Sequence, residues 1–163
     1  MRKLLTASAI LALITIACGP GSGTASQTPS GQAICVNAQA PHRAYVVVEH
    51  LSGRVVQACV GFQGDSINGP NLMKNSGVEF RTSTTSLGLG ICQVDNEPAH
   101  FDQCFPPGAP YWDLLLDVKG QPAWQESPSG LDHVQVADGG AIGWQYRPQT
   151  GSPPALPPLP KRT

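Results

Sequence analysis

Hydrophobic and polar positions alternate most clearly between residues 111 and 118, where the chain reads Tyr-Trp-Asp-Leu-Leu-Leu-Asp-Val. Successive side chains of a strand point to opposite faces, so this pattern predicts a strand with two distinct faces. One face carries Trp112, Leu114, Leu116 and Val118, and the other carries Tyr111, Asp113, Leu115 and Asp117. Because charges are rarely buried without a partner, we expect the Trp112 face in the core and the Asp113 face toward water.

Two runs rich in β-branched residues come earlier in the chain. Residues 44–49 and 54–60 flank the dipeptide Ser52-Gly53, which is suited to a turn. This arrangement predicts a β-hairpin. Neither run alternates cleanly, so the pattern leaves the register of the hairpin open.

A short helix is predicted between the hairpin and the later strands. Asn68 can cap its first turn, Pro70 suits the first turn itself, and Gly77 suits a left-handed stop. Leu72 and Met73 are the only large apolar residues inside this segment, so the helix should be short.

The remaining segments favour further strands. The Ser-, Thr- and Gly-rich stretch 81–90 predicts a loop that leads into a strand at 91–94. A turn is predicted at 138–140, and the apolar positions on either side of it are Val134, Val136, Ile142, Trp144 and Tyr146. A hairpin, one helix and then more strands is an α+β order. It predicts a β-grasp-like domain, in which a mostly antiparallel sheet packs on one short helix.

The N-terminus has the pattern of an export signal. Arg2 and Lys3 precede an apolar run that ends at Ala17 and is too short to span a bilayer as a stable helix. The following Cys18-Gly19 completes a segment that resembles the lipobox of bacterial lipoproteins. The resemblance implies cleavage before Cys18 and lipidation of its thiol, and hence a protein anchored in the cell membrane on its extracytoplasmic face. The alternative is an ordinary secretory signal in which Cys18 is incidental.

Composition divides the 163-residue chain into four segments. We expect a signal peptide at 1–17, a flexible tether at 18–33, the folded domain at 34–148 and a Pro-rich disordered tail at 149–163. The tether has almost no apolar residues with which to offset its ordering entropy. The tail favours polyproline II. A docking motif for a proline-reading partner is the alternative to the plain extended tail that we expect.

Cysteine usage points to disulfides. If Cys18 is lipidated, four cysteines remain, at positions 35, 59, 92 and 104. An even number in an oxidising compartment predicts two disulfides, with three possible pairings. We predict the sequential pairing, Cys35–Cys59 with Cys92–Cys104, which closes two local loops. No Cys-x-x-Cys occurs and the four histidines lack ligand spacing, so we expect no metal site.

Charge and motif content argue against two classes of function. The formal net charge is −1 and no basic stripe is present, so we expect no nucleic-acid partner. His–carboxylate neighbours occur at Asp132-His133 and at His100 with Asp102, but neither lies beside a nucleophile motif such as Gly-x-Ser-x-Gly. We therefore expect no enzymatic activity and no cofactor.

From Cys35 to Arg147, the order of short motifs resembles a family of bacterial β-grasp domains similar to the C-terminal, cobalamin-contacting domain of transcobalamin and intrinsic factor. The motifs are Cys-Gln-Val-Asp at 92–95, Tyr-Trp at 111–112, Trp124 followed by Ser127 and Gly130, and the closing Gly-Trp at 143–144. The four cysteines match the paired cysteines of actinobacterial secreted members. Asp95-Asn96 departs from the Asp-Gly turn of the family, and Leu114-Leu115 stands where a second aromatic pair often follows.

This resemblance implies a non-catalytic module that binds a bulky, planar small molecule such as a corrinoid. The candidate ligand contacts are Thr85, Ser86 and Leu87 in the loop, with Tyr111, Trp112 and Trp124 as apolar surface. Aromatic faces and a few polar groups are what such a site requires. The alternative for the two tryptophans is burial in the core, which residue statistics favour.

An interaction or structural module is the second class of function that fits the sequence. Such a module would bind another envelope protein or present a rigid sheet edge. The sequence does not separate it from a ligand-binding module. The two differ in whether Tyr111 and Trp124 surround a concavity or lie buried.

Overall fold

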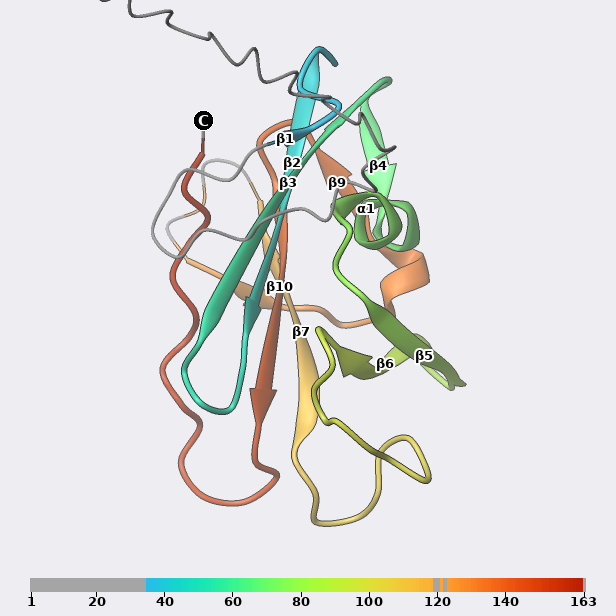
Figure 1. Cartoon of the computed structure of the whole chain (residues 1–163), viewed down its shortest axis with the longest axis vertical. Helices are drawn as coiled ribbons and strands as arrows, with labels where there is room; N and C mark the ends of the chain where they lie inside the picture. Colours follow the sequence, from blue (N-terminus) through green and yellow to red (C-terminus); the bar gives the residue numbers. More distant parts are fainter. Residues whose placement is uncertain (1–34, 119–120, 122, 163) are drawn as a thin grey trace, which may run out of the picture.

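The computed structural model describes residues 35–118, 121 and 123–162, so the predicted signal peptide, Cys18 and the tether lie outside the described residues. A six-stranded sheet with the strand order β1-β3-β2-β10-β7-β8 forms the centre of the molecule (Figure 1). Its strands are β1 (Cys35–Val36), β2 (His42–Glu49), β3 (Val55–Phe62), β7 (Tyr111–Asp117), β8 (Gln125–Glu126) and β10 (Ala141–Arg147). The smaller elements are β4 (Ser66–Asn68), α1 (Gly69–Ser76), β5 (Phe80–Thr85), β6 (Gly88–Val94), a 3₁₀ turn (Leu131–His133) and β9 (Gln135–Ala137).

The strand directions confirm the predicted α+β class with one short helix. The antiparallel hairpin β2–β3 has the last strand, β10, running parallel to β2 at its side. Strand β10 pairs antiparallel with β7 on its other edge, which makes the sheet mixed. A hairpin, a helix and a final strand parallel to the first hairpin strand is a β-grasp-like arrangement.

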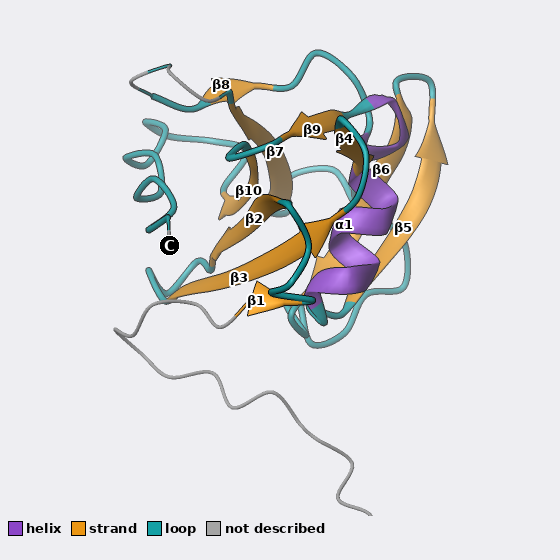
Figure 2. Ribbon diagram, turned by 90° about the horizontal axis from the view of Figure 1, so that it is seen from above, coloured by secondary structure: helices purple, strands orange, loops and turns teal. Residues whose placement is uncertain are grey.

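Helix α1 begins and ends where the sequence predicts. The side chain of Asn68 accepts a hydrogen bond from the backbone N–H of Asn71 at 2.9 Å, and Gly77 closes the helix in the left-handed conformation at φ 75°. Leu72 and Met73 are fully buried and hold the helix against one face of the sheet, as seen from above in Figure 2.

Each face of the sheet buries its own set of side chains. The inner face, under α1, holds the main core, which includes Val46, Val60, Trp112, Leu114, Ile142 and Trp144. The outer face holds a smaller cluster of Tyr45, Val47, Cys59, Leu115, Trp124 and Ala141. The sheet is therefore covered on both sides, which a single alternating strand does not reveal.

The faces of β7 correct part of the expectation from the sequence. Trp112 and Leu114 are buried in the main core as predicted, but Val118 lies past the end of the strand and is 54% exposed. Leu115 and Asp117, which we placed toward water, are buried. They are buried because Trp124 and the C-terminal segment cover the outer face of the sheet.

The predicted loop at 81–90 is instead most of a second hairpin. Strands β5 and β6 pair antiparallel from Phe80↔Val94 to Thr85↔Gly88. Four consecutive residues of β5, from Arg81 to Thr84, are exposed. An exposed strand carries no apolar alternation, so its Ser and Thr residues resembled a loop.

The C-terminal segment also differs from the disordered tail that we expected. After β10 the chain turns back and runs beside the sheet to the end, on the side opposite α1 (Figures 1 and 2). Pro157 and Pro160 are buried there, and the carbonyl of Pro157 accepts a hydrogen bond from the Trp124 indole at 2.8 Å. Composition alone missed this because the contacts come from the sheet.

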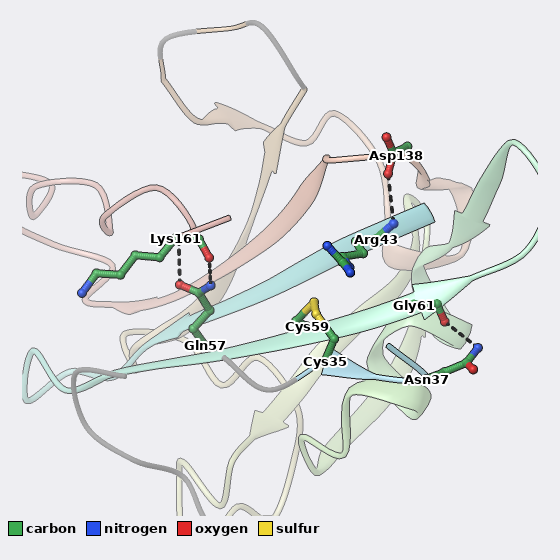
Figure 3. The surroundings of a disulfide bond; sticks show 8 residues. All are labelled: Cys35, Asn37, Arg43, Gln57, Cys59, Gly61, Asp138 and Lys161. Atoms are coloured by element: carbon green, nitrogen blue, oxygen red, sulfur yellow. Dashed lines mark hydrogen bonds between the residues drawn. A yellow bond between two sulfur atoms is a disulfide. The ribbon is translucent and has the colours of Figure 1, made fainter. Parts of the chain in front are cut away.

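Both disulfides have the predicted pairing. Cys35–Cys59 joins register partners of the parallel strands β1 and β3, beside the hydrogen bond from the Asn37 side chain to the Gly61 carbonyl (Figure 3). Cys92–Cys104 ties β6 to the loop before β7. Two disulfides indicate an extracytoplasmic compartment. Within the described residues, no helix has the length and apolarity needed to cross a membrane.

Candidate functional site

A cavity of about 470 Å³ lies between the 98–110 segment and the start of β7. That volume falls within the range of about 300–1,000 Å³ that is typical of small-molecule sites. Its aromatic lining consists of Phe101, Phe105, Tyr111, Trp112 and Tyr146, and its polar side chains are His100, Asp102 and Gln103. We call this the aromatic pocket.

The floor of the aromatic pocket is a stacked pair of rings. Trp112 and Tyr146 are register partners of β7 and β10, and their ring centroids lie 4.8 Å apart at an interplanar angle of 30°. The Trp112 indole N–H donates to the carbonyl of Glu97 at 2.8 Å, which fixes the ring. Burial, and then the nearby charge of Glu97, raise the pKa of the Tyr146 hydroxyl, so it is protonated at neutral pH.

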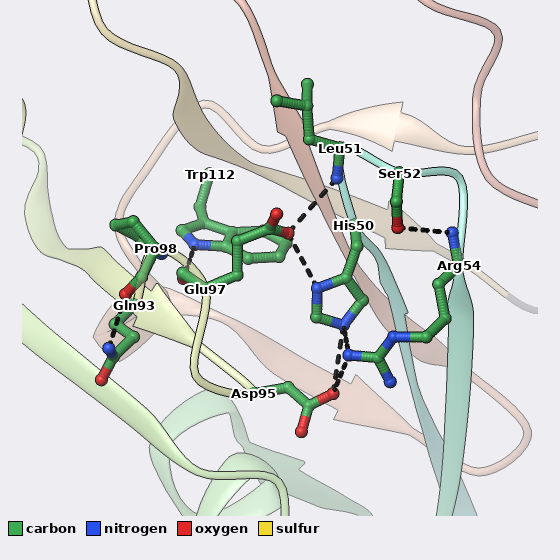
Figure 4. Close-up of polar contacts among 9 residues, drawn as sticks. All are labelled: His50, Leu51, Ser52, Arg54, Gln93, Asp95, Glu97, Pro98 and Trp112. Atoms are coloured by element: carbon green, nitrogen blue, oxygen red, sulfur yellow. Dashed lines mark hydrogen bonds and ion pairs between the residues drawn. The ribbon is translucent and has the colours of Figure 1, made fainter. Parts of the chain in front are cut away.

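A polar network behind Trp112 holds the loop that carries Glu97 (Figure 4). The His50 ring is almost fully buried and meets the Trp112 ring edge-on, with centroids 5.9 Å apart. His50 Nδ1 lies 2.8 Å from Glu97 Oε2, which also accepts from the backbone N–H of Leu51 at 3.3 Å. The network therefore connects the end of β2 to the edge of the pocket.

The second nitrogen of His50 faces Arg54 and Asp95. Its Nε2 lies 2.7 Å from an Arg54 guanidinium nitrogen and 3.1 Å from Asp95 Oδ2. Arg54 also donates to the same carboxylate oxygen at 2.8 Å. A proton on Nδ1 lets His50 donate to Glu97 and accept from Arg54. The His50 side chain is 4% exposed, so it fixes the loop and is not open to a ligand.

Phe105 forms a strained part of the pocket wall. Its φ of 58° places a bulky residue in the left-handed region, a conformation that is found most often at binding sites and tight turns. The ring lies against Gly90 of β6, where an added Cβ would come within 2.5 Å of it. The adjacent Cys92–Cys104 disulfide ties this wall to β6.

Tyr111 lies at the rim of the pocket, where Arg147 fixes its hydroxyl group. Its hydroxyl accepts a hydrogen bond from Arg147 Nε at 3.0 Å. Arg147 also pairs with Asp113 at 2.9 Å and with Glu126 at 2.8 Å. Burial raises the pKa of the Asp113 carboxyl, and the charge of Arg147 opposes that rise.

The other predicted ligand residues lie elsewhere. Thr85, Ser86 and Leu87 form the tip of the β5–β6 hairpin, where the Thr85 hydroxyl donates to the Gly88 carbonyl at 2.8 Å, and Leu87 is 64% exposed. Trp124 is buried on the outer face of the sheet. Of the six predicted contacts, the structure brings Tyr111 and Trp112 together at one cavity.

A second hollow, of about 680 Å³, shares His100 and Phe101 with the aromatic pocket. Its lining is mostly polar and contains both signs of charge, including Lys74, Glu79 and Arg81. Aromatic and apolar walls with a few polar groups are the usual form of a small-molecule site. We therefore take the smaller, aromatic pocket as the candidate site.

Three residues that line the pocket were not predicted from the sequence as ligand contacts: Phe101, Phe105 and Tyr146. Phe101 and Phe105 lie in the segment before β7, which has no periodic pattern, and only Phe101 lies within the loop that Cys92 and Cys104 close. Tyr146 was noted only as an apolar position after the predicted turn at 138–140, and its pairing with Trp112 depends on a strand register that the sequence does not supply.

The side chains at the aromatic pocket suit binding by ring stacking and a few hydrogen bonds. His100 and Asp102 line its mouth and are both exposed. In the described parts of the chain, no three His, Cys, Asp or Glu side chains are grouped so that they could hold a metal ion.

Comparison with known proteins gives a distant structural likeness. No protein-family model matches the chain, and no curated protein matches its sequence. Among solved structures, it is similar to the crystal structure of a "putative metal binding protein" from Ruminococcus gnavus, with a TM-score of 0.49 and 15% sequence identity. The match covers 67% of this chain and 99% of that chain. A likeness at this level carries no conclusion about what this chain binds.

Proposed function

We propose that this protein is a non-catalytic, extracytoplasmic lipoprotein whose aromatic pocket binds a small planar molecule. The observation that carries the proposal is the pocket itself, in which the stacked Trp112–Tyr146 floor meets a wall containing Phe105. A planar ligand can stack on such rings while the few polar groups at the mouth orient it. The two disulfides support the location outside the cytoplasm.

The lipid anchor follows from the Ala17-Cys18-Gly19 segment. Lipidation of Cys18 would place the domain at the outer surface of the cell membrane, at the end of the 18–33 tether. The domain would meet ligands from the cell wall or the medium there. The family resemblance adds corrinoids to the planar ligands that are worth testing.

Binding to the mature protein should be measured with a panel of corrinoids and smaller planar aromatic compounds, by calorimetry. Phe105→Ala should weaken binding of the best ligand at least about tenfold, because an aromatic contact at a desolvated site is lost. Leu87→Ala is the matched control. It removes an exposed apolar side chain from the hairpin tip, and the affinity should stay within about twofold.

Either of two results would contradict the proposal. One is that no member of the panel binds with a dissociation constant below about 1 mM, which corresponds to about −4 kcal/mol. The other is a ligand whose affinity falls with Leu87→Ala and not with Phe105→Ala. That result would place the ligand-binding site at the tip of the β5–β6 hairpin, as the sequence suggested.

A further inference from the structure

The outer face of the sheet makes an ordered set of contacts with the C-terminal segment. Pro157 and Pro160 are buried on that face, while the residues on either side of each are exposed. A spacing of three residues is the repeat of a polyproline II helix, which presents one face of its chain at every third position. The segment thus meets the sheet with the periodicity that its proline content favours.

Hydrogen-bond donors on the sheet point at the carbonyls of this segment. The Trp124 indole N–H donates to the carbonyl of Pro157 at 2.8 Å, and Gln145 Nε2 donates to that of Ala155 at 2.6 Å. A polyproline chain has no internal hydrogen bonds, so its carbonyls remain free to accept. An aromatic-lined groove with such donors is how proline-rich peptides are recognised.

The contact surface is formed by buried residues of the sheet. The Trp124 ring lies over Gly143 of β10, where an added Cβ would come within 3.1 Å of it. Leu115 and Val47 are the register partners of Gly143 on the two adjacent strands, and both are fully buried. Gln145 is itself 1% exposed and is also held by Glu49 at 2.7 Å.

The end of the segment is fixed by polar contacts. Gln57 exchanges two hydrogen bonds with the backbone of Lys161, at 2.8 and 2.9 Å, as drawn in Figure 3. Arg162 donates to the Gly139 carbonyl at 2.9 Å and pairs with the buried carboxylate of Asp117. Proline packing and a terminal ion pair therefore define both the register and the direction of the peptide.

We propose that the outer face of the sheet is a binding groove for an extended proline-rich peptide, and that residues 153–162 of this chain are its resident, exchangeable ligand. In the lipid-anchored state, release of this segment would expose Trp124 and Gln145 at the cell surface. This site is separate from the aromatic pocket, which lies at the start of β7 beside the 98–110 loop.

The test begins with the folded full chain. A protease site is introduced between Gly151 and Ser152, both exposed, and is cleaved after folding. The released fragment, 152–163, is then a non-covalent ligand, and its dissociation on dilution is followed by Trp fluorescence and by gel filtration. We expect saturable, reversible binding, with re-binding of the synthetic peptide 152–163 to the emptied protein.

Two pairs of proline substitutions in that peptide test the register. Pro157→Ala with Pro160→Ala should raise the dissociation constant at least about tenfold, because two buried contacts are lost. Pro154→Ala with Pro158→Ala removes the same number of prolines at exposed positions and should change it less than about threefold. Trp124→Phe in the protein should raise the dissociation constant of the unaltered peptide about fivefold, because the indole N–H that donates to the Pro157 carbonyl is lost.

Three outcomes would overturn the proposal. The first is a fragment that leaves a folded protein and does not re-bind at concentrations up to about 1 mM, near the effective concentration of a short tether. The second is an equal effect of the two proline pairs. The third is unfolding of the domain on release of the fragment, which would make the segment a part of the core and not a ligand.

Discussion

A single residue, Trp112, contacts both the polar network around His50 and the aromatic pocket. One edge of its indole meets the buried His50 ring, its N–H holds the Glu97 carbonyl, and its face stacks on Tyr146. It is therefore both a core residue and the floor of the aromatic pocket. The sequence left both core burial and ligand contact open for this residue, and the structure shows it 5% exposed and part of the pocket lining.

Trp112→Ala should lower the free energy of unfolding by about 3–5 kcal/mol, because it removes a large buried side chain and leaves a cavity. Tyr111→Ala should cost far less, about 1 kcal/mol, since Tyr111 is partly exposed and loses mainly its hydrogen bond from Arg147. Thermal or urea unfolding of the two variants measures the difference. A larger loss for Tyr111→Ala would show that the core face of β7 is assigned wrongly.

Asp113 should make stability depend on pH in the acid range. Burial raises the pKa of its carboxyl in the folded protein above the ordinary value, despite the opposing charge of Arg147. The folded state then binds more protons than the unfolded state between the two pKa values, so the contribution of Asp113 to stability falls as the pH rises through that window. Asp113→Asn removes this contribution.

Urea unfolding of the wild type and Asp113→Asn should be measured from about pH 3 to about pH 6, the range in which carboxylates titrate. The unfolding free energy of the wild type, minus that of the variant, should decrease as the pH rises. A difference that stays flat or increases would show that Arg147 outweighs burial at this site.

The loop stapled by Cys92–Cys104 is the element on which the aromatic pocket depends. It carries Phe101 and is followed directly by Phe105, and besides its disulfide it is held through Glu97, Asp95 and the carbonyl of Pro98. The Cys35–Cys59 disulfide instead joins β1 to β3 at one edge of the six-stranded sheet. Both disulfides therefore stabilise the domain, but only Cys92–Cys104 also fixes the wall of the aromatic pocket.

Replacing Cys92 and Cys104 by serine should lower stability by about 2–3 kcal/mol in the chain-entropy model and should speed amide hydrogen exchange in residues 98–106. The matched control replaces Cys35 and Cys59 by serine. The Cys35–Cys59 disulfide closes a longer loop, so its removal should lower stability by about 3–4 kcal/mol. Exchange in 98–106 should stay slow in the control. Equal acceleration in both variants would mean that the pocket wall is not held locally by its disulfide.

The sequence predicted elements wherever a local signal is sufficient. Asn68 and Gly77 mark the ends of α1 through their own backbone and side-chain chemistry, and Ser52-Gly53 marks the β2–β3 hairpin. Strand β5 escaped prediction because an exposed strand has no hydrophobic alternation. The burial of Leu115 was not predicted because the residues that cover it, Trp124 and the C-terminal segment, come later in the chain and reach it only in the folded structure.

Whole-molecule organisation explains why only two of the five aromatic residues in the pocket lining were predicted as ligand contacts. Tyr111 and Trp112 stood out as adjacent aromatic residues in a strongly patterned strand. Their partners Phe105 and Tyr146 depend on a loop closure and on the β7–β10 register, which are properties of the assembled sheet. Trp124 was predicted as apolar surface for a ligand, and the structure places it on the opposite face, against the chain's own C-terminal segment.

Attachment through Cys18 decides whether the aromatic pocket and the proposed peptide groove act at the membrane surface or in the medium. Cys18→Ala should move the protein from the membrane fraction to the soluble fraction, or leave its signal peptide uncut, because the thiol is the predicted acceptor of the lipid. Thr15→Leu is the control: position 15 lies three residues before Cys18, where a lipobox usually has Leu, so this change should leave the protein anchored and fully processed. Metabolic labelling with a radioactive fatty acid should mark the wild type and Thr15→Leu but not Cys18→Ala. If wild type and Cys18→Ala partition alike and are cleaved at another residue, the protein is secreted without an anchor, and its pocket and groove would act in the medium.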